Sequence, residues 1–381
     1  MEAELRKRIL IIASLSDSLL NFRRDLIQTL VIEGNEVLCC AAEKDHLDGS
    51  YTHAEIELSK IGAKWQSYPL SRTSTNPIED FKTLLSLRKI VKGFKPDIVL
   101  SYTVKPNIYG SIASRGYRSA KIFSLITGIT AGLRDQREIR SPRGKALRWL
   151  YRIGLQNNEG VIFQNPDDLD WLKSLGIITT QKTHLVNGSG VDLEQFPPVP
   201  LPSNSPLSFL CIARLLAEKG IREFADAARN VKQTYPSVEF NLVGPIDPQP
   251  SSVQLAEIKA WEAEGVLHYH GQQADVRPWL AKCSVFVLPS YREGTPRTVL
   301  EALATGRAII TSNAPGCRQT VVDGLNGYLV PVRSVSDLVG ALSQFCQNPE
   351  LVKKMGDESL KLSKNFDVHS VTKSMIDFMI N

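Results

Sequence analysis

The stretch from Leu288 to Pro331, LPSYREGTPRTVLEALATGRAIITSNAPGCRQTVVDGLNGYLVP, carries the strongest fold signal in the chain. An apolar run that ends in it, SVFVLPS, predicts a buried strand, and the polar loop YREG follows. The pattern TVLEALATG then predicts a helix that Gly306 ends, with Thr295 as the N-cap and Pro296 in the first turn. The next apolar run predicts another strand. Such a unit is typical of a parallel α/β sheet, where loops at the carboxyl ends of strands bind anions.

The same alternation of apolar runs and helical patterns extends over the rest of the chain. The expected strands are Arg8–Leu15, Glu36–Ala41, Asp97–Tyr102, Lys121–Ile126, Gly160–Gln164, His184–Asn187, Leu207–Ala213, Val238–Val243, Val266–His270, Ser284–Pro289, Arg307–Thr311 and Gly327–Val330. Several of these runs are continuously apolar, which indicates parallel strands buried on both faces. The pattern therefore predicts two α/β domains of similar size.

A proline-rich segment separates the two groups of strands. FPPVPLPSNSP has five prolines between Pro197 and Pro206, and such a run sustains neither a helix nor a central strand. The last segment spaces its apolar residues on one helical face, so we expect a terminal helix that packs on the first domain. The expected divisions are a first domain over 1–192, a linker over 193–206, a second domain over 207–365 and a terminal helix over 366–381.

Composition excludes several classes of protein. The 381 residues include 43% hydrophobic and 22% charged residues, the ordinary balance of a soluble globular chain. The net charge of +5 is too small to make nucleic acid the expected partner. The excess is unevenly placed: residues 1–190 have 27 basic and 20 acidic residues, or +7, and the remainder has 18 and 20, or −2. The six cysteines show no metal-binding spacing and predict buried thiols in a reducing compartment.

The beginning of the chain, MEAELRKRILIIASLSDSLL, superficially resembles a signal peptide. Its apolar run is short, lacks a small-residue cleavage site and leads into charged residues, so we interpret it as the first buried strand. No apolar run reaches the ~18 residues of a membrane-spanning helix. We therefore expect a cytoplasmic protein.

The opening stretch also carries a family resemblance. E-G-T-P-x-x-x-x-E-A, then G-x-x-I-I-T and P-G-x-x-x-x-V-x-D-G-x-N-G-Y-L-V, resembles the retaining nucleotide-sugar glycosyltransferases of family 4. That resemblance implies the GT-B fold, two Rossmann-like α/β domains facing a central cleft. It also implies that Glu293 contacts the donor sugar and Glu301 the ribose hydroxyls, whereas an isolated pair of this spacing indicates only solvated helix charges. The turn at the helix start would face the donor diphosphate; its residues are Gly294, Thr295, Pro296 and Arg297, of which Pro296 has no N–H.

A second donor-side element follows the strand near residue 210. The segment ARLLAEKGIREF resembles the R-x-x-x-x-K-G turn of the family, with Arg214 and Lys219 as the Arg and Lys of that pattern. Fixed bases there stabilise the negative charge that develops on the leaving diphosphate. The alternative is a pair of exposed bases at a helix start. We take Glu293, Arg214 and Lys219 as candidate catalytic residues. The resemblance adds three donor-binding residues that place the nucleotide: Gly244, His270 and Gly271.

The first domain is expected to bind the acceptor. SYTVKPNIYGSIASR, SLITGITAGL and PLSRTSTNPIED resemble a subgroup that adds N-acetylhexosamines to polyprenyl-diphosphate-linked saccharides or other surface-glycan precursors. The candidate acceptor-binding residues are Lys105, Asn107, Arg72, Thr127 and Gly128. Lys105 and Arg72 suit an acceptor phosphate, or are ordinary exposed bases. The loop after the first strand, SLSDSLLNFRRD, lacks the Gly-Gly pair that many family members have there.

Two further segments bear on partners and metals. Residues 134–152 contain seven basic and two acidic residues with aromatic neighbours, which suits an anionic membrane surface or, alternatively, a solvated helix face. Asp168-Leu169-Asp170 matches a metal-binding D-x-D pattern, but Asn165 and Pro166 make it the start of a helix. We expect no metal and no cofactor.

Together these features predict a retaining, metal-independent transfer of a sugar from a UDP-sugar, in particular a UDP-N-acetylhexosamine, to a lipid-linked or other glycan acceptor. Peripheral association with the plasma membrane would fit such an acceptor. Two alternatives stay open: a nucleotide-sugar epimerase or hydrolase of the same fold, and a protein that binds nucleotide sugars without catalysis.

Overall fold

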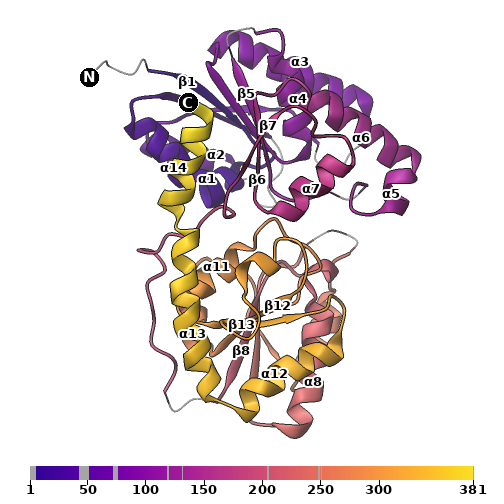
Figure 1. Ribbon diagram of the computed structural model, residues 1–381, viewed down its shortest axis with the longest axis vertical. Coiled ribbons are helices and arrows are strands. Elements are labelled where there is room, and N and C mark those ends of the chain that lie inside the picture. Colours follow the sequence, from indigo (N-terminus) through magenta and orange to yellow (C-terminus); the bar gives the residue numbers. More distant parts are fainter. Residues whose placement is uncertain are drawn as a thin grey trace. The chain divides into compact units, whose positions relative to one another are not determined.

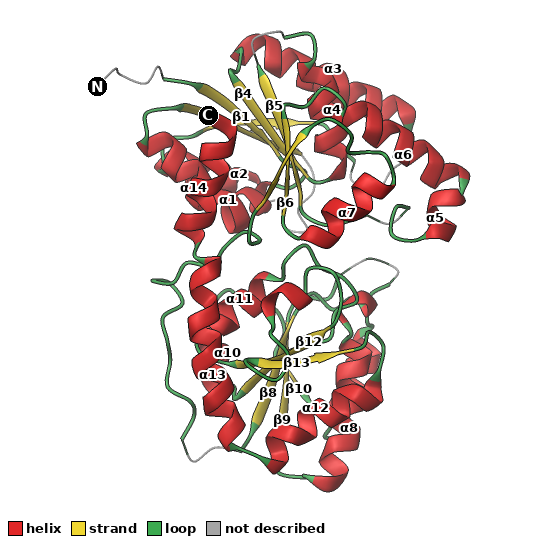
Figure 2. Ribbon diagram, in the orientation of Figure 1, coloured by secondary structure: helices red, strands yellow, loops and turns green. Residues whose placement is uncertain are grey.

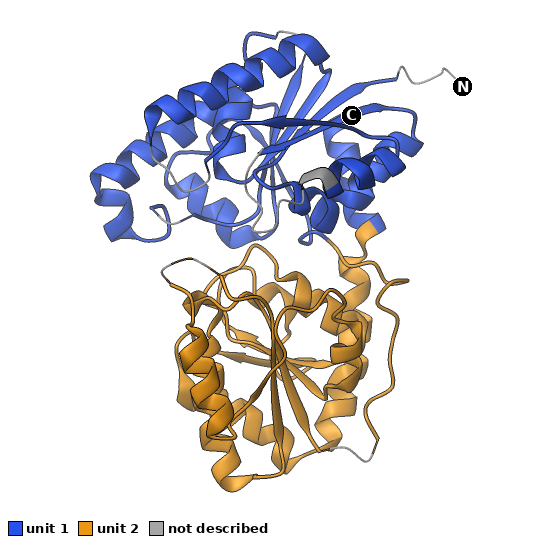
Figure 3. Cartoon of the chain, turned by 180° about the vertical axis from the view of Figure 1, so that it is seen from behind, with its two compact units in different colours: residues 1–189, 369–381 blue, residues 190–368 orange. Residues whose placement is uncertain are grey.

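The computed structural model describes residues 6–42, 51–71, 76–117, 120–130, 132–203, 206–247, 249 and 251–380. The chain forms two compact units (Figure 3): unit 1 comprises Met1–Ser189 with His369–Asn381, and unit 2 comprises Gly190–Val368. Each unit contains one parallel β-sheet with helices packed on both of its faces (Figure 2). The prediction of two Rossmann-like α/β domains is therefore confirmed.

Unit 1 is built on a seven-stranded sheet in the order β3-β2-β1-β4-β5-β6-β7 (Figure 1). Its strands are β1 (Arg8–Ile12), β2 (Glu36–Ala42), β3 (Lys64–Tyr68), β4 (Ile98–Tyr102), β5 (Lys121–Ile126), β6 (Gly160–Phe163) and β7 (Lys182–Leu185). Its helices are α1 (Ser16–Ile32), α2 (Tyr51–Lys60), α3 (Pro77–Phe94), α4 (Val104–Ser114), α5 (Gln136–Arg140), α6 (Pro142–Leu155), α7 (Pro166–Ser174) and α14 (Val368–Ile380). One core lies under α1, α2 and α14, and a second lies under α3, α4, α6 and α7.

Unit 2 is built on a six-stranded sheet in the order β10-β9-β8-β11-β12-β13. Its strands are β8 (Ser208–Ile212), β9 (Glu239–Val243), β10 (His268–Tyr269), β11 (Val285–Leu288), β12 (Ala308–Ser312) and β13 (Gly327–Val330). Its helices are η1 (Ala217–Lys219), α8 (Ile221–Thr234), α9 (Leu255–Ala263), α10 (Arg277–Lys282), α11 (Arg297–Ala304), η2 (Arg318–Thr320), α12 (Val335–Gln347), α13 (Glu350–Ser363) and η3 (Lys364–Phe366). One hydrophobic core spans the unit.

Both sheets have a point at which the strand order reverses. In unit 1 the chain runs from β1 outward to β3 and then returns to β4 beside β1, and in unit 2 it returns to β11 beside β8. The loops that leave the carboxyl ends of such neighbouring strands diverge in opposite directions, which leaves room for a ligand. The loops of β8 and β11 carry the motifs singled out from the sequence.

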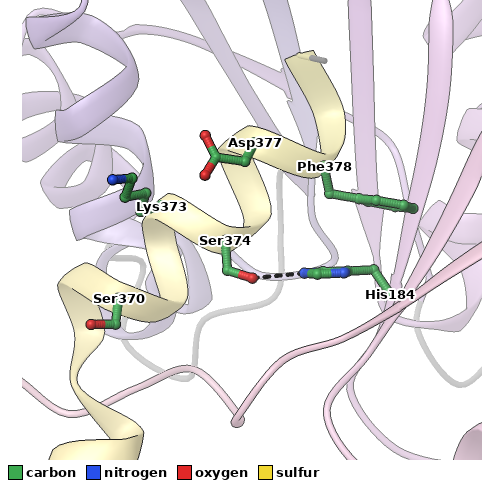
Figure 4. Close-up of a pocket in the computed structure, with 6 residues that line it drawn as sticks. All are labelled: His184, Ser370, Lys373, Ser374, Asp377 and Phe378. Carbon is green, nitrogen blue, oxygen red and sulfur yellow. Dashed lines mark hydrogen bonds between the residues drawn. The ribbon is translucent and has the colours of Figure 1, made fainter.

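Helix α14 completes the core of unit 1, although the preceding helix belongs to unit 2. Its side chains Met375 and Met379 are buried against the sheet. On the edge strand β7, the Nε2 atom of His184 lies 2.7 Å from Ser374 Oγ, and its ring stacks on Phe378 at 4.8 Å. A groove of about 500 Å³ runs along this contact (Figure 4), lined by the six residues that the figure labels.

Each expected strand is present, with ends that differ by a few residues, and the strand interpretation of the first apolar run is correct. Strand β3 was not predicted. The proline-rich segment expected to link the domains lies within unit 2 instead, because the division falls between Ser189 and Gly190. The buried guanidinium of Arg307 donates to the carbonyls of Pro200, Leu280 and Ala281 and so fastens this segment to the unit.

Candidate active site

The two donor-side motifs of unit 2 meet at the point where its strand order reverses. Lys219 ends the turn after β8, and Glu293 lies in the loop after β11, the strand that pairs with β8. The Nζ atom of Lys219 lies 2.5 Å from Glu293 Oε1, and the two side chains are only 15% and 14% exposed. The structure therefore brings together two candidate catalytic residues that stand 74 positions apart.

Glycines allow these loops to approach so closely. Gly220, which follows Lys219, has a φ of 71°, and a Cβ atom there would collide with the carbonyl of Pro289. Gly316 has a φ of 80°, and a Cβ atom there would likewise collide with the carbonyl of Glu293. The Glu293 N–H donates to the carbonyl of Pro315 at 3.0 Å. Other residues are strained at such φ values, so both positions favour glycine.

The third candidate catalytic residue, Arg214, binds a carboxylate that was not predicted. Its Nη1 atom lies 2.9 Å from Asp247 Oδ2, in the loop after β9. The Arg214 side chain is 50% exposed, so its guanidinium remains accessible, whereas Asp247 is 11% exposed. Gly244, with a φ of 147°, packs against the carbonyl of Ala213 and lets this loop reach Arg214.

Glu301 lies inside helix α11 with its side chain only 8% exposed. Arg297 Nε donates to Glu301 Oε1 at 2.9 Å, a pair one helical turn apart. Burial raises the pKa of Glu301, and the neighbouring Arg297 only partly opposes that shift. The carboxylate is thus held by a base at the start of the helix.

Helix α11 begins at Arg297, so the prediction of Thr295 as its N-cap is wrong. Pro296 has the extended backbone of a cap position, and the hydroxyl of Thr295 donates instead to the adjacent carbonyl of Gly294. No side chain caps this helix start. The Val299 N–H donates to the carbonyl of Pro296 at 3.0 Å, and the start of the helix, with the positive end of its dipole, is suited to an anion.

His270 directly follows strand β10, which pairs with β9. Its Nε2 atom lies 2.7 Å from Asn241 Oδ1, and its ring lies 4.0 Å from the ring of Trp279. Burial lowers the pKa of His270, so the imidazole is neutral at pH 7 and fits a positioning role. The neighbouring Gly271 has a φ of 68° and accepts a bond from the Gly244 N–H. The contact with Trp279 was missed because the sequence does not show how the loop folds back.

A tyrosine that the sequence reasoning missed holds the loop of Glu293. Tyr291 Oη donates to Glu223 Oε1 on α8 at 2.5 Å, and the Arg333 guanidinium lies 4.6 Å from its ring centroid. The Tyr291 N–H donates to the carbonyl of Glu218. Arg333 has a left-handed φ of 61°, an uncommon conformation for this residue type. These bonds fix the loop two residues before Glu293.

The acceptor-side candidates lie at the carboxyl ends of β4 and β5 in unit 1. Lys105 Nζ binds Asp80 Oδ1 at 2.7 Å, and both side chains are less than one fifth exposed. Asn107 is fully buried and donates to the carbonyl of Leu125, so it supports the end of β5. Thr127 and Gly128, with a φ of 138°, follow that strand. Arg72 lies outside the described residues.

The segment after β1 contains no glycine, and its serine hydroxyls contact hydroxyl groups at the end of β4. Ser14 Oγ lies 2.5 Å from Thr103 Oγ1, across the reversal point between β1 and β4. Thr103 has a φ of 69° and a ψ of 163°, a conformation that only glycine adopts readily. Ser18 Oγ lies 2.8 Å from the hydroxyl of Tyr102 below it. A strained residue at this position was not predictable from a threonine in the sequence.

The D-x-D segment starts helix α7, as expected. Asn165 accepts a bond from the Asp168 N–H at 2.8 Å and caps the helix. Asp168 is fully buried, whereas Asp170 is exposed. Among the residues that the structure describes, no group of three or more His, Cys, Asp or Glu is arranged to hold a metal ion. None of the described helices has the length and apolar character needed to cross a membrane.

Two parallel α/β units, with base–carboxylate pairs where one sheet reverses its order, have the architecture of the GT-B fold. Comparison with known families agrees: the profile of "Glycosyl transferase 4-like" proteins matches residues 8–165, and that of "Glycosyl transferases group 1" matches residues 206–348. The chain belongs to these glycosyltransferases of the GT-B fold.

Similar proteins of known sequence are also glycosyltransferases. A Campylobacter jejuni protein, N,N'-diacetylbacillosaminyl-diphospho-undecaprenol alpha-1,3-N-acetylgalactosaminyltransferase, is 28% identical over 91% of this chain and 93% of its own length. An Escherichia coli protein, UDP-Gal:alpha-D-GlcNAc-diphosphoundecaprenol alpha-1,3-galactosyltransferase, is 28% identical over 70% of each chain.

Solved structures show the same fold at low sequence identity. Sucrose-phosphate synthase of Thermosynechococcus elongatus has a TM-score of 0.79 at 18% identity and covers 98% of both chains. Anabaena HepE, solved in complex with UDP, has a TM-score of 0.76 at 16% identity over 97% of this chain and 98% of its own.

Proposed function

We propose that this glycosyltransferase moves an N-acetylhexosamine from a UDP-sugar to a glycan carried on a polyprenyl diphosphate, in the synthesis of a surface polysaccharide or glycoconjugate. The names of the Campylobacter and Escherichia relatives both specify an acceptor on undecaprenyl diphosphate, and one specifies a UDP-sugar. The first of them transfers N-acetylgalactosamine. HepE, which shares the fold, was solved with UDP.

The observation that carries the proposal is the Lys219–Glu293 pair at the reversal point of the unit 2 sheet. A diphosphate bound there would have Lys219 and the exposed Arg214 beside its oxygens, together with the uncapped start of α11. Glu293 would accept hydrogen bonds from the donor sugar, and Glu301, steadied by Arg297, would accept them from the ribose. Fixed charges of this kind stabilise the transition state more than the ground state.

The proposed reaction retains the anomeric configuration and needs no metal ion. The bond between the sugar and the diphosphate breaks on the face that the acceptor hydroxyl attacks, through an oxocarbenium-like state. The new glycosidic bond forms as the leaving diphosphate takes the proton of that hydroxyl. Arg214 and Lys219 supply the positive charge that a metal provides in other transferases. Retention rests on the resemblance to family 4.

In unit 1 we assign the acceptor to the carboxyl ends of β4 and β5. Lys105 would exchange its partner Asp80 for an acceptor phosphate, and Thr127 and Gly128 would allow the acceptor sugar to approach the backbone. Asn107 keeps that edge in place from below. Residues 134–152 would lie near an anionic membrane, so the chain would act in the cytoplasm, peripheral to the inner face of the plasma membrane.

A donor and acceptor screen tests the proposal. Purified protein is incubated with labelled UDP- and GDP-sugars and polyprenyl-diphosphate acceptors, with EDTA present. We expect transfer from a UDP-N-acetylhexosamine with retention, and a decrease in turnover of about 10²- to 10³-fold in Glu293→Gln, the magnitude typical of a lost transition-state contact. Glu264→Gln, an exposed carboxylate of the same unit, is the matched control. A protein that binds the donor but transfers nothing would contradict the proposal, and loss of activity in EDTA alone would contradict its metal-free part.

A further inference from the structure

Helix α3 has two chemically distinct faces. Leu87 and Val91 lie on the side that packs into the core of unit 1. The opposite side bears Ile78, Phe81 and Leu85, which are 67%, 59% and 49% exposed. These three residues follow each other at spacings of three and four, so they form one continuous apolar stripe. Exposed large apolar residues gathered in a stripe indicate a surface that contacts something other than water.

The same outward side of α3 is strongly basic. Lys82, Arg88, Lys89 and Lys92 are all exposed, and none forms an ion pair with a described residue. The acidic residues of the helix lie in its first turn, where Asp80 is already bound to Lys105. The apolar stripe therefore occupies the first half of the helix, and uncompensated positive charge occupies the second.

A groove continues this surface. It has a volume of about 590 Å³ and lies between the second half of α3 and the end of α4. Arg88, Lys89 and Lys92 line it together with Leu85 and Tyr117. Three bases and two apolar side chains around a shallow groove suit an anionic head group that remains attached to an acyl chain.

Helix α6 repeats the pattern on the other side of α4. Both α3 and α6 pack on α4 (Figure 1), which has no exposed residue of its own. Trp149 of α6 is 61% exposed and lies between the exposed bases Lys145 and Arg152, one turn to either side. Helix α6 contains no acidic residue. The two outer helices thus share apolar side chains among bases.

We infer that the outward sides of α3 and α6 form one docking surface for an anionic phospholipid bilayer, into which Ile78, Phe81 and Leu85 insert. The bases of both helices face the charged head groups, and Trp149 lies at the interface, where its amphipathic ring is favoured. This inference deepens the membrane association included in the proposed function, and it does not depend on the proposed sugar transfer. It places the apolar anchor on α3, outside the basic segment 134–152.

Co-sedimentation of the full chain with vesicles tests the inference without any sugar substrate. The vesicles are phosphatidylcholine, alone or with about one third phosphatidylglycerol, enough to give the anionic surface potential that attracts basic residues. We expect binding to the anionic vesicles only. The affinity should decrease at least about tenfold in the triple variant Ile78→Ser/Phe81→Ser/Leu85→Ser, and likewise in Arg88→Gln/Lys89→Gln/Lys92→Gln.

The matched control is Ile32→Ser/Ile56→Ser, because these residues are 75% and 50% exposed on α1 and α2, which cover the other face of the sheet. It should bind the vesicles as the wild type does. Trp149 fluorescence should shift to the blue with anionic vesicles, and Trp149→Phe should abolish that shift. Should the triple variant unfold early, Phe81→Asp alone takes its place. Wild-type binding that is absent, equally strong on neutral vesicles, or unchanged in the α3 variants would overturn the inference.

Discussion

At the scale of single residues, the site depends on charges that the fold has already paired. The side chains of Lys219 and Glu293 are only 15% and 14% exposed and lie in contact, so each charge has its partner within the site. Arg214 differs, because half of its side chain is exposed while its partner Asp247 is not. In the proposed function, a bound diphosphate would therefore contact Lys219, which the buried Glu293 already orients, and Arg214, which is still accessible.

The buried carboxylate of Glu301 makes stability depend on pH. Burial raises its pKa in the folded protein above the ordinary 4.5, so the unfolded chain releases this proton at lower pH than the folded protein does. The resulting stabilisation is present below pH 4.5 and is lost as the pH rises through the folded pKa. We expect Glu301→Gln, which stays neutral, to gain stability relative to the wild type as the pH rises toward neutrality.

Urea unfolding of both proteins across this pH range measures the difference. Glu257→Gln is a useful control at a partly exposed carboxylate, because the hydrogen bond from Arg222 lowers the pKa of Glu257 and the effect on stability has the opposite sign. A stability difference between Glu301→Gln and the wild type that does not change with pH would contradict the expectation.

Tyr291 should affect both stability and turnover through the loop that it fixes. Removing its hydroxyl leaves Glu223 without the donor of its 2.5 Å bond, and Glu223 Oε2 already has no partner among the described residues. We expect Tyr291→Phe to lower the free energy of unfolding by about 1–3 kcal/mol, the cost of an unsatisfied buried acceptor. Turnover should also decrease, because Glu293 is two residues away.

Tyr328→Phe is the matched control for this change, because no described residue bonds the Tyr328 hydroxyl and its ring packs on Phe345. Thermal and urea unfolding compare the two variants. Equal stability in both would show that the Tyr291–Glu223 bond contributes nothing to holding the loop.

At the scale of elements, the apolar pattern was enough to predict the strands that are buried on both faces. The strands β1, β8 and β12 have continuous apolar runs, and the sequence predicts them to within a few residues. Strand β3 was missed because KWQSY is polar and alternating, as befits the edge of the sheet, where only one side has a partner strand. Element order was thus predictable from periodicity, and among the four edge strands, β3, β7, β10 and β13, only β3 was missed.

The contact between β7 and α14 depends on the charge of His184. Burial lowers its pKa from the ordinary 6.5, so the unfolded chain takes up this proton at higher pH than the folded protein does. The stability that the neutral ring contributes is present above pH 6.5 and is lost as the pH falls toward the folded pKa. The groove beside the ring is also lined by Lys373 and Asp377.

Unfolding at a series of pH values below 6.5 measures this loss. We expect His184→Phe, which keeps an aromatic ring against Phe378, to lose less stability than the wild type over that interval. The exposed residue His53 on α2, outside this groove, provides the control substitution His53→Gln. Parallel pH profiles for wild type and His184→Phe would contradict the assignment.

At the scale of the whole molecule, the sequence showed which residues belong to each motif but not which of them meet. Glu293 and Lys219 were predicted from a family pattern. Asp247, in the loop after β9, and Glu223, on α8, belong to no such pattern, and only the structure shows that they bond Arg214 and Tyr291. The strained backbone of Thr103 is similarly a product of the surrounding fold. Chain connectivity is a further property at this scale, because unit 1 includes α14, a segment that follows unit 2 in the sequence.

That connectivity predicts unequal behaviour of the two units when they are separated. Residues 190–368 are one continuous stretch and contain every strand of the second sheet with its core. Residues 1–189 retain the first sheet but lack α14, whose Val371, Met375, Ile376 and Met379 are at most 6% exposed. Burying each such side chain contributes about 1.5–3 kcal/mol as an upper estimate. The fragment 1–189 therefore loses a large share of a marginal stability.

We expect the fragment 190–368 to unfold cooperatively by itself, as judged by circular dichroism during urea titration. The fragment 1–189 should unfold at a lower urea concentration, and a synthetic peptide of residues 369–381 should raise that midpoint progressively as its concentration increases. A peptide with Met375 and Met379 replaced by Ser is the control and should have no effect, because it removes the buried contacts and leaves the length unchanged. Equal stability of the fragment 1–189 with and without the peptide would contradict a stabilising role of α14 in the core of unit 1.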